Sequence, residues 1–248
     1  MAGFPALLSG SRNVVVVRKP LPRRQWDPTL DSMIRTCSSS RVLEDTLQKL
    51  SADEVARMRA IYEPLTQSVR ELIDATIRTE TGADTVAAVK AEIDAATAQL
   101  RANQLEGSFG IRFGAQGSEM PWGNAVIGVR NPIAPPVVLI RAEDLSVSAD
   151  FHLGAAYEGP PGHVHGGVSA MILDHVLGEG ASLPGQPRLT GTLTMRYRRM
   201  TRLGDLHTEA RIVRTEGVKT YAVGHIADAE GITVEAEGVF ITPRWARG

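Results

Sequence analysis

The stretch that most constrains the fold runs from residue 159 to residue 180 and reads GPPGHVHGGVSAMILDHVLGEG. Its proline- and glycine-rich first part predicts a turn. Residues 165–180 carry apolar side chains on nearly every side of a helix, which is typical of a helix buried in a core. Into that core the pattern places one acid, Asp174. Because a buried carboxylate is costly unless it is paired, hydrogen-bonded or used, Asp174 is the first candidate site residue.

Composition excludes several classes of function. The chain has 248 residues, of which 43% are hydrophobic and 22% charged, as in soluble globular proteins. A net charge of −1 gives no electrostatic reason to expect nucleic acid or a membrane surface as a partner. No apolar run approaches the roughly 20 residues that a membrane span needs.

The first forty residues are weakly patterned. Residues 14–17 favour a short strand, and the basic cluster at 18–24 is either a solvated arm or a phosphate contact. An apolar patch before a basic one is the reverse of a secretory signal. The single cysteine, Cys37, excludes an internal disulfide framework and fits a reducing compartment, so we expect a cytoplasmic protein.

Two helices are predicted next. Ser51 and Glu54 have the spacing of a capping box, and the apolar stripe that follows is amphipathic, although Pro64 is expected to kink or interrupt it. Gly82 breaks the pattern, and Asp84 is expected to cap a second helix. We therefore predict an antiparallel helical hairpin without chemistry of its own, which packs on the following domain or extends a dimer interface.

A change of composition at residues 106–120 divides the chain. Glycines are scattered there among polar residues and lack the strand-to-helix setting of a phosphate loop, so the segment is interpreted as a linker that its aromatic residues anchor. The predicted organisation is a mainly helical N-terminal extension at 1–120, with a Gly-rich linker at 106–120, and a second domain at 121–248.

The second domain has the pattern of strands, one helix, then strands. Residues 137–140 form a short apolar run, and residues 145–153 alternate between apolar and polar side chains. Four further strand-like segments, separated in part by glycine turns, are expected at 188–198, 206–214, 219–228 and 232–241. This order predicts a mostly antiparallel sheet curled around the helix, and its open edge favours pairing with a second copy.

Within residues 121–243 the motifs resemble those of the hotdog-fold acyl-CoA thioesterases, in particular the PaaI-like, Them-type branch. The shared signature is His-Gly-Gly at 165–167, an acid eight residues after Gly166, and a threonine sixteen residues after that acid, in a strand that ends Tyr-x-Arg. The first 120 residues match nothing that is familiar from that family.

This resemblance implies an α+β hotdog fold, in which a curved antiparallel sheet wraps around one long helix, assembled as homodimers or dimers of dimers (homotetramers). It implies hydrolysis of an acyl-CoA thioester, within lipid metabolism and without a metal or organic cofactor. The family's catalytic acid falls on Asp174, its oxyanion donor on the backbone N–H of Gly166 or Gly167, its motif histidine on His165, and a further threonine on Thr190.

Helix geometry adds a consequence. Gly166 and Asp174 are eight residues apart, which is about 12 Å at 1.5 Å per residue. One thioester carbonyl does not reach both groups of the same chain, so we expect each active site to combine the helix start of one subunit with the acid of another.

Each of these residues also has an alternative, purely structural interpretation. Asp174 is alternatively a structural acid, His165 only a helix cap, and Thr190 an ordinary strand residue. Three arginines either bind CoA phosphates or form a solvated strand face: Arg196, Arg198 and Arg199. Histidines 152, 163 and 165 lack the partners and spacing of a metal site, so no metal is expected.

Two other functions remain open. One is a hotdog enoyl-CoA hydratase or dehydratase, whose motif is not found. The other is an acyl-CoA-binding module that has lost catalysis. The residues do not distinguish a general base from an anhydride mechanism, CoA from carrier-protein thioesters, or one acyl chain length from another.

Overall fold

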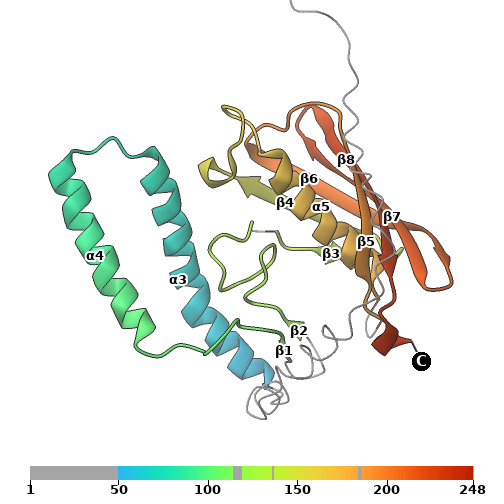
Figure 1. Ribbon diagram of the computed structural model, residues 1–248, viewed down its shortest axis with the longest axis horizontal. Helices are drawn as coiled ribbons and strands as arrows, with labels where there is room; N and C mark the ends of the chain where they lie inside the picture. Colours follow the sequence, from blue (N-terminus) through green and yellow to red (C-terminus); the bar gives the residue numbers. More distant parts are fainter. Residues whose placement is uncertain (1–49, 114–118, 136, 184–185, 248) are drawn as a thin grey trace, which may run out of the picture.

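The computed structural model (Figure 1) describes residues 50–113, 119–135, 137–183 and 186–247. The predictions for the strand at 14–17, the basic cluster at 18–24, Cys37 and the helical signals from residue 41 to residue 49 lie outside these residues. Within them, the predicted α+β hotdog architecture is confirmed: one helix lies on an antiparallel sheet, and a helical part precedes them.

The sheet has six strands in the order β3-β4-β6-β7-β8-β5, and every neighbouring pair is antiparallel. The strands are β3 (Ile140–Arg141), β4 (Val147–Leu153), β5 (Leu189–Tyr197), β6 (Gly204–Glu216), β7 (Lys219–Asp228) and β8 (Gly231–Ile241). Both predicted glycine turns join consecutive strands, and Gly217 and Gly231 adopt positive φ angles of 56° and 111°. The alternating segment is confirmed as β4, although the run begins two residues later than expected because Leu145 lies in a turn with a φ of 68°.

The predicted central helix is α5 (Gly166–Ala181), and it lies across the sheet. Ile172, Leu173, Val176 and Leu177 are fully buried between the helix and the strands. The expectation that the helix is buried on all sides is wrong for the single chain. Its opposite face, which carries Asp174, is only half-buried, because the sheet covers just one side of it.

Glycines in the sheet let α5 approach closely. A Cβ on Gly224 of β7 would lie 2.6 Å from the carbonyl oxygen of Glu209 and 2.6 Å from Leu177 Cδ1. A Cβ on Gly180 of the helix would lie 3.3 Å from Val147. The Leu177 side chain therefore packs directly on the backbone of β7, and this close contact sets which face of the helix points outward.

The first N-terminal helix is α3 (Ala52–Arg78), and the predicted capping box at its start is confirmed: the Glu54 N–H donates to Ser51 Oγ, and the Ser51 N–H donates to Glu54. Of the two outcomes expected at Pro64, a kink or an interruption, the interruption is wrong, since α3 continues through it. Proline removes only one N–H donor, and the hydroxyls of Thr66 and Ser68 donate to neighbouring carbonyls of the same helix.

The second helix is α4 (Ala83–Arg101), and it runs antiparallel to α3 as predicted (Figure 1). Asp84 is not its cap. Gly82 occupies the cap position, and Asp84 lies in the first turn, where its charge favours the positive end of the helix dipole. α3 packs on the short 3₁₀ helix η2 (Ala155–Tyr157), whereas α4 buries none of its residues.

The glycine-rich linker contributes two short strands, β1 (Arg112–Phe113) and β2 (Glu119–Met120), which pair antiparallel. Phe109 stacks on the buried Trp122 with ring centroids 6.1 Å apart, so these two aromatic residues do anchor the segment. The domain boundary at residue 121 stays a prediction.

We predict that Gly224→Ala lowers the free energy of unfolding by about 1–3 kcal/mol, because the new methyl group meets both the carbonyl oxygen of Glu209 and the side chain of Leu177 on α5. Gly107→Ala is the matched control, since no atom lies within 4 Å of its added Cβ. Urea unfolding measures both. Equal stabilities of the two variants would contradict the close helix–sheet contact.

Candidate functional site

The turn before α5 is held by its own backbone. The N–H of His165 donates to the carbonyl oxygen of Tyr157 at 2.9 Å, and that of Val164 donates to the carbonyl of Thr201 at 2.9 Å. Gly162, at a φ of 72°, donates its N–H to Glu158 Oε1 at 2.6 Å. These bonds join the turn to η2 and to the chain after β5, so they position the start of the helix.

His165 is the N-cap of α5. Its Nδ1 accepts the N–H of Gly167 at 3.0 Å, and its carbonyl oxygen accepts the N–H of Val168 at 2.9 Å. Nδ1 as an acceptor means that a neutral ring carries its proton on Nε2. Of the two candidate oxyanion donors, the Gly167 N–H is therefore bonded to His165. The Gly166 N–H donates to no acceptor in the part of the chain that the structure describes.

Tyr197 is a site residue that the sequence predicted only as part of a motif. Its hydroxyl donates to the carbonyl oxygen of Gly166 at 2.8 Å. A Cβ added to Gly166 would lie 3.4 Å from the tyrosine ring. Tyr197 is about half exposed, and partial desolvation of its hydroxyl raises its pKa, so the hydroxyl keeps the proton that it donates. The last residue of β5 thus fixes the first residue of α5. The motif Tyr-x-Arg was the only signal for it, because the pairing between helix and strand is not local.

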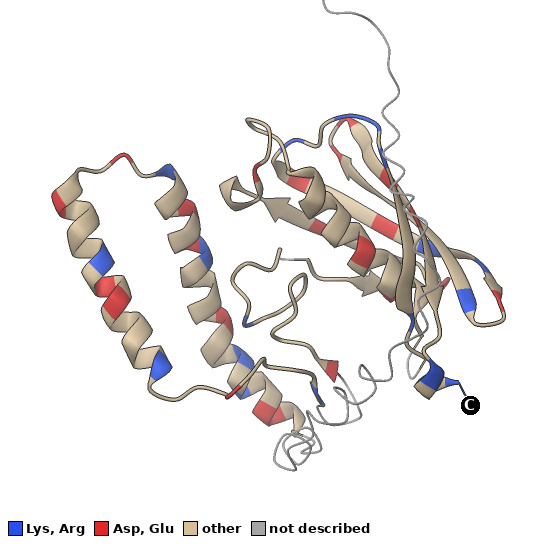
Figure 2. Ribbon diagram, in the orientation of Figure 1, with Lys and Arg blue, Asp and Glu red and all other residues tan. Residues whose placement is uncertain are grey.

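Asp174 lies two turns further along α5, on its half-buried outward face. It forms no ion pair or hydrogen bond with any residue that the structure describes. The helix carries two acids, Asp174 and Glu179, and no Lys or Arg (Figure 2). This carboxylate is therefore not neutralised by a cation from the described part of its own chain.

His175 follows Asp174 in the helix. Burial lowers the pKa of His175 by more than the nearby charges of Glu179 and Asp174 raise it, so the ring is neutral at pH 7. Its Nε2 is buried and has no hydrogen-bond partner among the described residues. Asp174 is thus next to a buried histidine ring that carries no charge.

Thr190 lies at the far end of the helix from Gly166. It pairs across the strands with the fully buried Phe240, and paired residues share a face of the sheet, so Thr190 lies on the helix-facing side of β5. Phe240 in turn lies 3.5 Å from where a Cβ on Gly178 would be. Along β5, Thr190 is roughly 23 Å from Tyr197 at about 3.3 Å per residue. One chain therefore does not bring all the predicted catalytic residues together.

The three predicted phosphate-binding arginines divide into two groups. Arg199 pairs with Asp228 and donates to the carbonyl of Gly231 at 2.9 Å. The Arg199–Asp228 hydrogen bonds lower the pKa of Asp228 and raise that of Arg199, so this arginine holds the β7–β8 turn. Arg196 and Arg198 both approach Glu235, at 3.8 and 2.6 Å, beside a shallow groove of about 410 Å³. Only these two are available at the surface.

The histidines considered as metal ligands bond to different partners. His152 Nδ1 is 2.8 Å from Asp205, and His163 Nδ1 is 2.8 Å from the carbonyl oxygen of Pro161. Within the described ranges no group of three or more His, Cys, Asp or Glu side chains is arranged to hold a metal ion.

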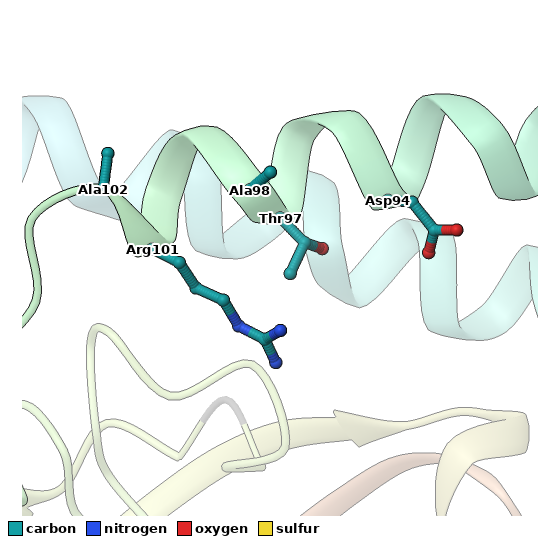
Figure 3. Close-up of a pocket in the computed structure, with 5 residues that line it drawn as sticks. All are labelled: Asp94, Thr97, Ala98, Arg101 and Ala102. Carbon is teal, nitrogen blue, oxygen red and sulfur yellow. The ribbon is translucent and has the colours of Figure 1, made fainter.

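The helical extension contains its own hollows. One, of about 500 Å³, is lined by α4 and by Ala102, which follows it, and Figure 3 shows Asp94, Thr97 and Arg101 projecting from one side of that helix. It contains no nucleophile or base from the predicted site. None of the described helices is both long and apolar enough to span a lipid bilayer.

The thioesterase superfamily model matches residues 161–235. The acyl-coenzyme A thioesterases THEM5 of Homo sapiens and Mus musculus are 29% and 27% identical over 94 residues. That match covers 37% of this chain and 38% of each relative, so the chain spans well under half of their length. A crystal structure of protein RHA08564, a thioesterase superfamily protein, is 34% identical and superposes with a TM-score of 0.65, over 73% of this chain and 94% of that one.

We predict that Tyr197→Phe lowers the free energy of unfolding by about 0.5–1.5 kcal/mol, because the Gly166 carbonyl loses its side-chain donor. Tyr62→Phe serves as the control, since the Tyr62 hydroxyl bonds to no described residue. Thermal unfolding compares the two. A loss as large in the control as in Tyr197→Phe would show that the hydrogen bond is not the cause.

Proposed function

Because this chain belongs to the thioesterase superfamily, we propose that it hydrolyses the thioester of an acyl-CoA to a free acid and CoA. The observation that carries this proposal is that one helix presents an unengaged backbone N–H at its start, on Gly166, and an unpaired carboxylate on its outward face, at Asp174. Thioester hydrolysis needs such a pair: a donor for the carbonyl oxygen and a base or nucleophile for the carbonyl carbon.

The Gly166 N–H is the proposed oxyanion donor. It lies at the positive end of the α5 dipole, and glycine lets a carbonyl approach the backbone closely. One such donor is commonly worth about 2.7–4 kcal/mol in the transition state. His165 acts as a positioning residue in this scheme, because it engages the neighbouring Gly167 N–H and leaves that of Gly166 free.

Asp174 is the proposed base or nucleophile. As a base it takes a proton from water while the water oxygen attacks the carbonyl carbon. The carbon–sulfur bond then breaks, and the CoA sulfur leaves and takes up the proton. As a nucleophile the carboxylate attacks first, displaces the CoA thiolate and forms an anhydride that water hydrolyses. Neither route uses a metal or an organic cofactor.

The site is proposed to form between two copies of the chain. Two surfaces support this: the half-buried face of α5 that carries Asp174, and the outer edge of β5, which pairs with no described strand. A dimer joined there brings the start of one α5 toward Asp174 of the other, in two equivalent sites. Thr190, on the helix-facing side of β5, would lie at the same boundary.

Arg196 and Arg198 are the proposed contacts for CoA phosphates, since both are at least half exposed and share a single carboxylate. Arg199 is not proposed for this role because it is bound in the β7–β8 turn. The cytoplasmic location expected from the sequence remains part of the proposal.

We predict that the protein releases thiol from acyl-CoA and that Asp174→Asn lowers the rate by about 100-fold or more, because the amide is neither a base nor a nucleophile. Glu179→Gln, an acid on the same helix, is the matched control and should keep the rate. Assays over short, medium, long and aromatic acyl-CoAs define the substrate. Full activity of Asp174→Asn would remove this acid from the mechanism, and CoA-ester binding without thiol release would favour a non-catalytic module.

We predict that two inactive variants complement each other. Gly166→Pro removes the oxyanion N–H yet suits the first position of a helix, and the extended backbone of His165 accepts a following proline. Asp174→Ala removes the acid. When the two chains are unfolded together and refolded as a mixture, one site per heterodimer is intact, so roughly a quarter of the activity should return. If circular dichroism shows folded chains and the mixture stays inactive, the site does not combine two subunits.

A further inference from the structure

A second hollow lies in the N-terminal half of the structure, between the first half of α3, the chain that follows α4, and the loop after β2. It has a volume of about 610 Å³. Its walls include Met58, Leu65, Val69 and Phe109, together with two guanidinium groups, those of Arg112 and Arg130. The wall also includes Asn103 and Gln104, so it is apolar on one side and polar on the other. Pockets of this size that combine apolar walls with a few polar groups hold small organic ligands. None of the residues proposed for hydrolysis lines it.

The two arginines are held by aromatic rings. The Arg130 guanidinium carbon lies 3.6 Å from the centroid of the Tyr62 ring and 5.2 Å from that of Phe109, and Arg112 lies 4.7 Å from the Phe109 centroid. Stacking uses the flat face of a guanidinium and leaves its N–H edge to bind a carboxylate with two parallel hydrogen bonds. Among residues 50–113, 119–135, 137–183 and 186–247, no acid forms an ion pair with either arginine.

The loop that carries Arg130 is tightly bonded to itself. The Arg130 N–H donates to the carbonyl of Trp122 at 2.9 Å, and Asn124 Oδ1 accepts the N–H groups of Val126 and Ile127 at 2.7 and 3.1 Å. Its Gly128 packs so closely that an added Cβ would lie 2.3 Å from the carbonyl oxygen of Asn124. The cation is therefore placed at the wall of the hollow before any ligand binds, which reduces the entropy lost on binding.

We propose that this hollow is a binding site for a monocarboxylate with an apolar chain. Its carboxylate meets Arg130 and Arg112, and its chain lies along Met58, Leu65 and Val69. Two cations beside an apolar wall suit one anionic head on an apolar body. A cation is repelled, and a polyphosphate would require more positive charge than the two arginines supply. The site is separate from the hydrolytic site and stands whether or not the protein is a thioesterase.

Calorimetric titration of the full-length protein with decanoate tests this proposal, and Trp fluorescence gives a second readout because Trp122 stacks on Phe109 in the wall of the hollow. We expect saturable binding of decanoate, weaker by about tenfold or more in Arg130→Met, which loses the charge-assisted hydrogen bonds but keeps an apolar side chain. Arg101→Met is the matched control: Arg101 lines the separate hollow of α4 (Figure 3) and its loss should leave the affinity unchanged.

A second variant keeps the proposal testable if Arg130→Met does not fold. Leu65 is 40% exposed on α3, so Leu65→Glu should fold normally while it places a negative charge beside the ligand and abolishes decanoate binding. Decanol and decyltrimethylammonium should bind at least tenfold more weakly than decanoate. The proposal would be overturned if decanol bound as tightly as decanoate, or if Arg130→Met and Leu65→Glu both kept the wild-type affinity. Decanoate would then bind at another site, such as the hydrolytic one.

Discussion

The close contact between α5 and the glycines of the sheet is the constraint on which the rest of the structure depends. With Gly224 of β7 and Gly180 of the helix at the contact, the Leu177 side chain rests on the backbone of β7, and the helix backbone packs on the side chains of Val147 and Ala210. Leu173, Val176 and Leu177 must then face the sheet, and the 3.6-residue period puts Asp174 on the opposite side. The position of the acid follows from packing, as does the meeting of Tyr197 with the start of the helix.

Much of this fold could be predicted from local sequence patterns. Alternation identified β4, glycines at 217 and 231 marked the turns, and apolar residues together with His165-Gly-Gly marked the central helix within a residue of its observed start. The errors have physical causes. A helix that is apolar all round looks the same in sequence whether its own chain or another subunit covers the second face, so the half-exposure of Asp174 was missed. Pro64 was overrated because the loss of one donor in a 27-residue helix does not end it.

The candidate site was less predictable than the fold, because its contacts join segments far apart in the chain. Arg199 lies among three similar arginines in sequence, and only the pairing of β7 with β8 shows that Asp228 engages it. The engagement of the Gly167 N–H by His165, which distinguishes the two candidate donors, depends on the rotamer of one side chain. The hollow at Arg130 had no sequence signal: its walls come from α3, the segment after α4 and the loop after β2.

The central claim is that one thioester meets the helix start of one subunit and the acid of another. The most direct test is a crystal structure with an acyl-CoA analogue in which a methylene group replaces the thioester sulfur. We predict the ketone oxygen at about 3 Å from the Gly166 nitrogen of one protomer, with Asp174 of the partner subunit beside the ketone carbon. A ketone that contacts both groups of a single chain, or that binds away from α5, would contradict the account.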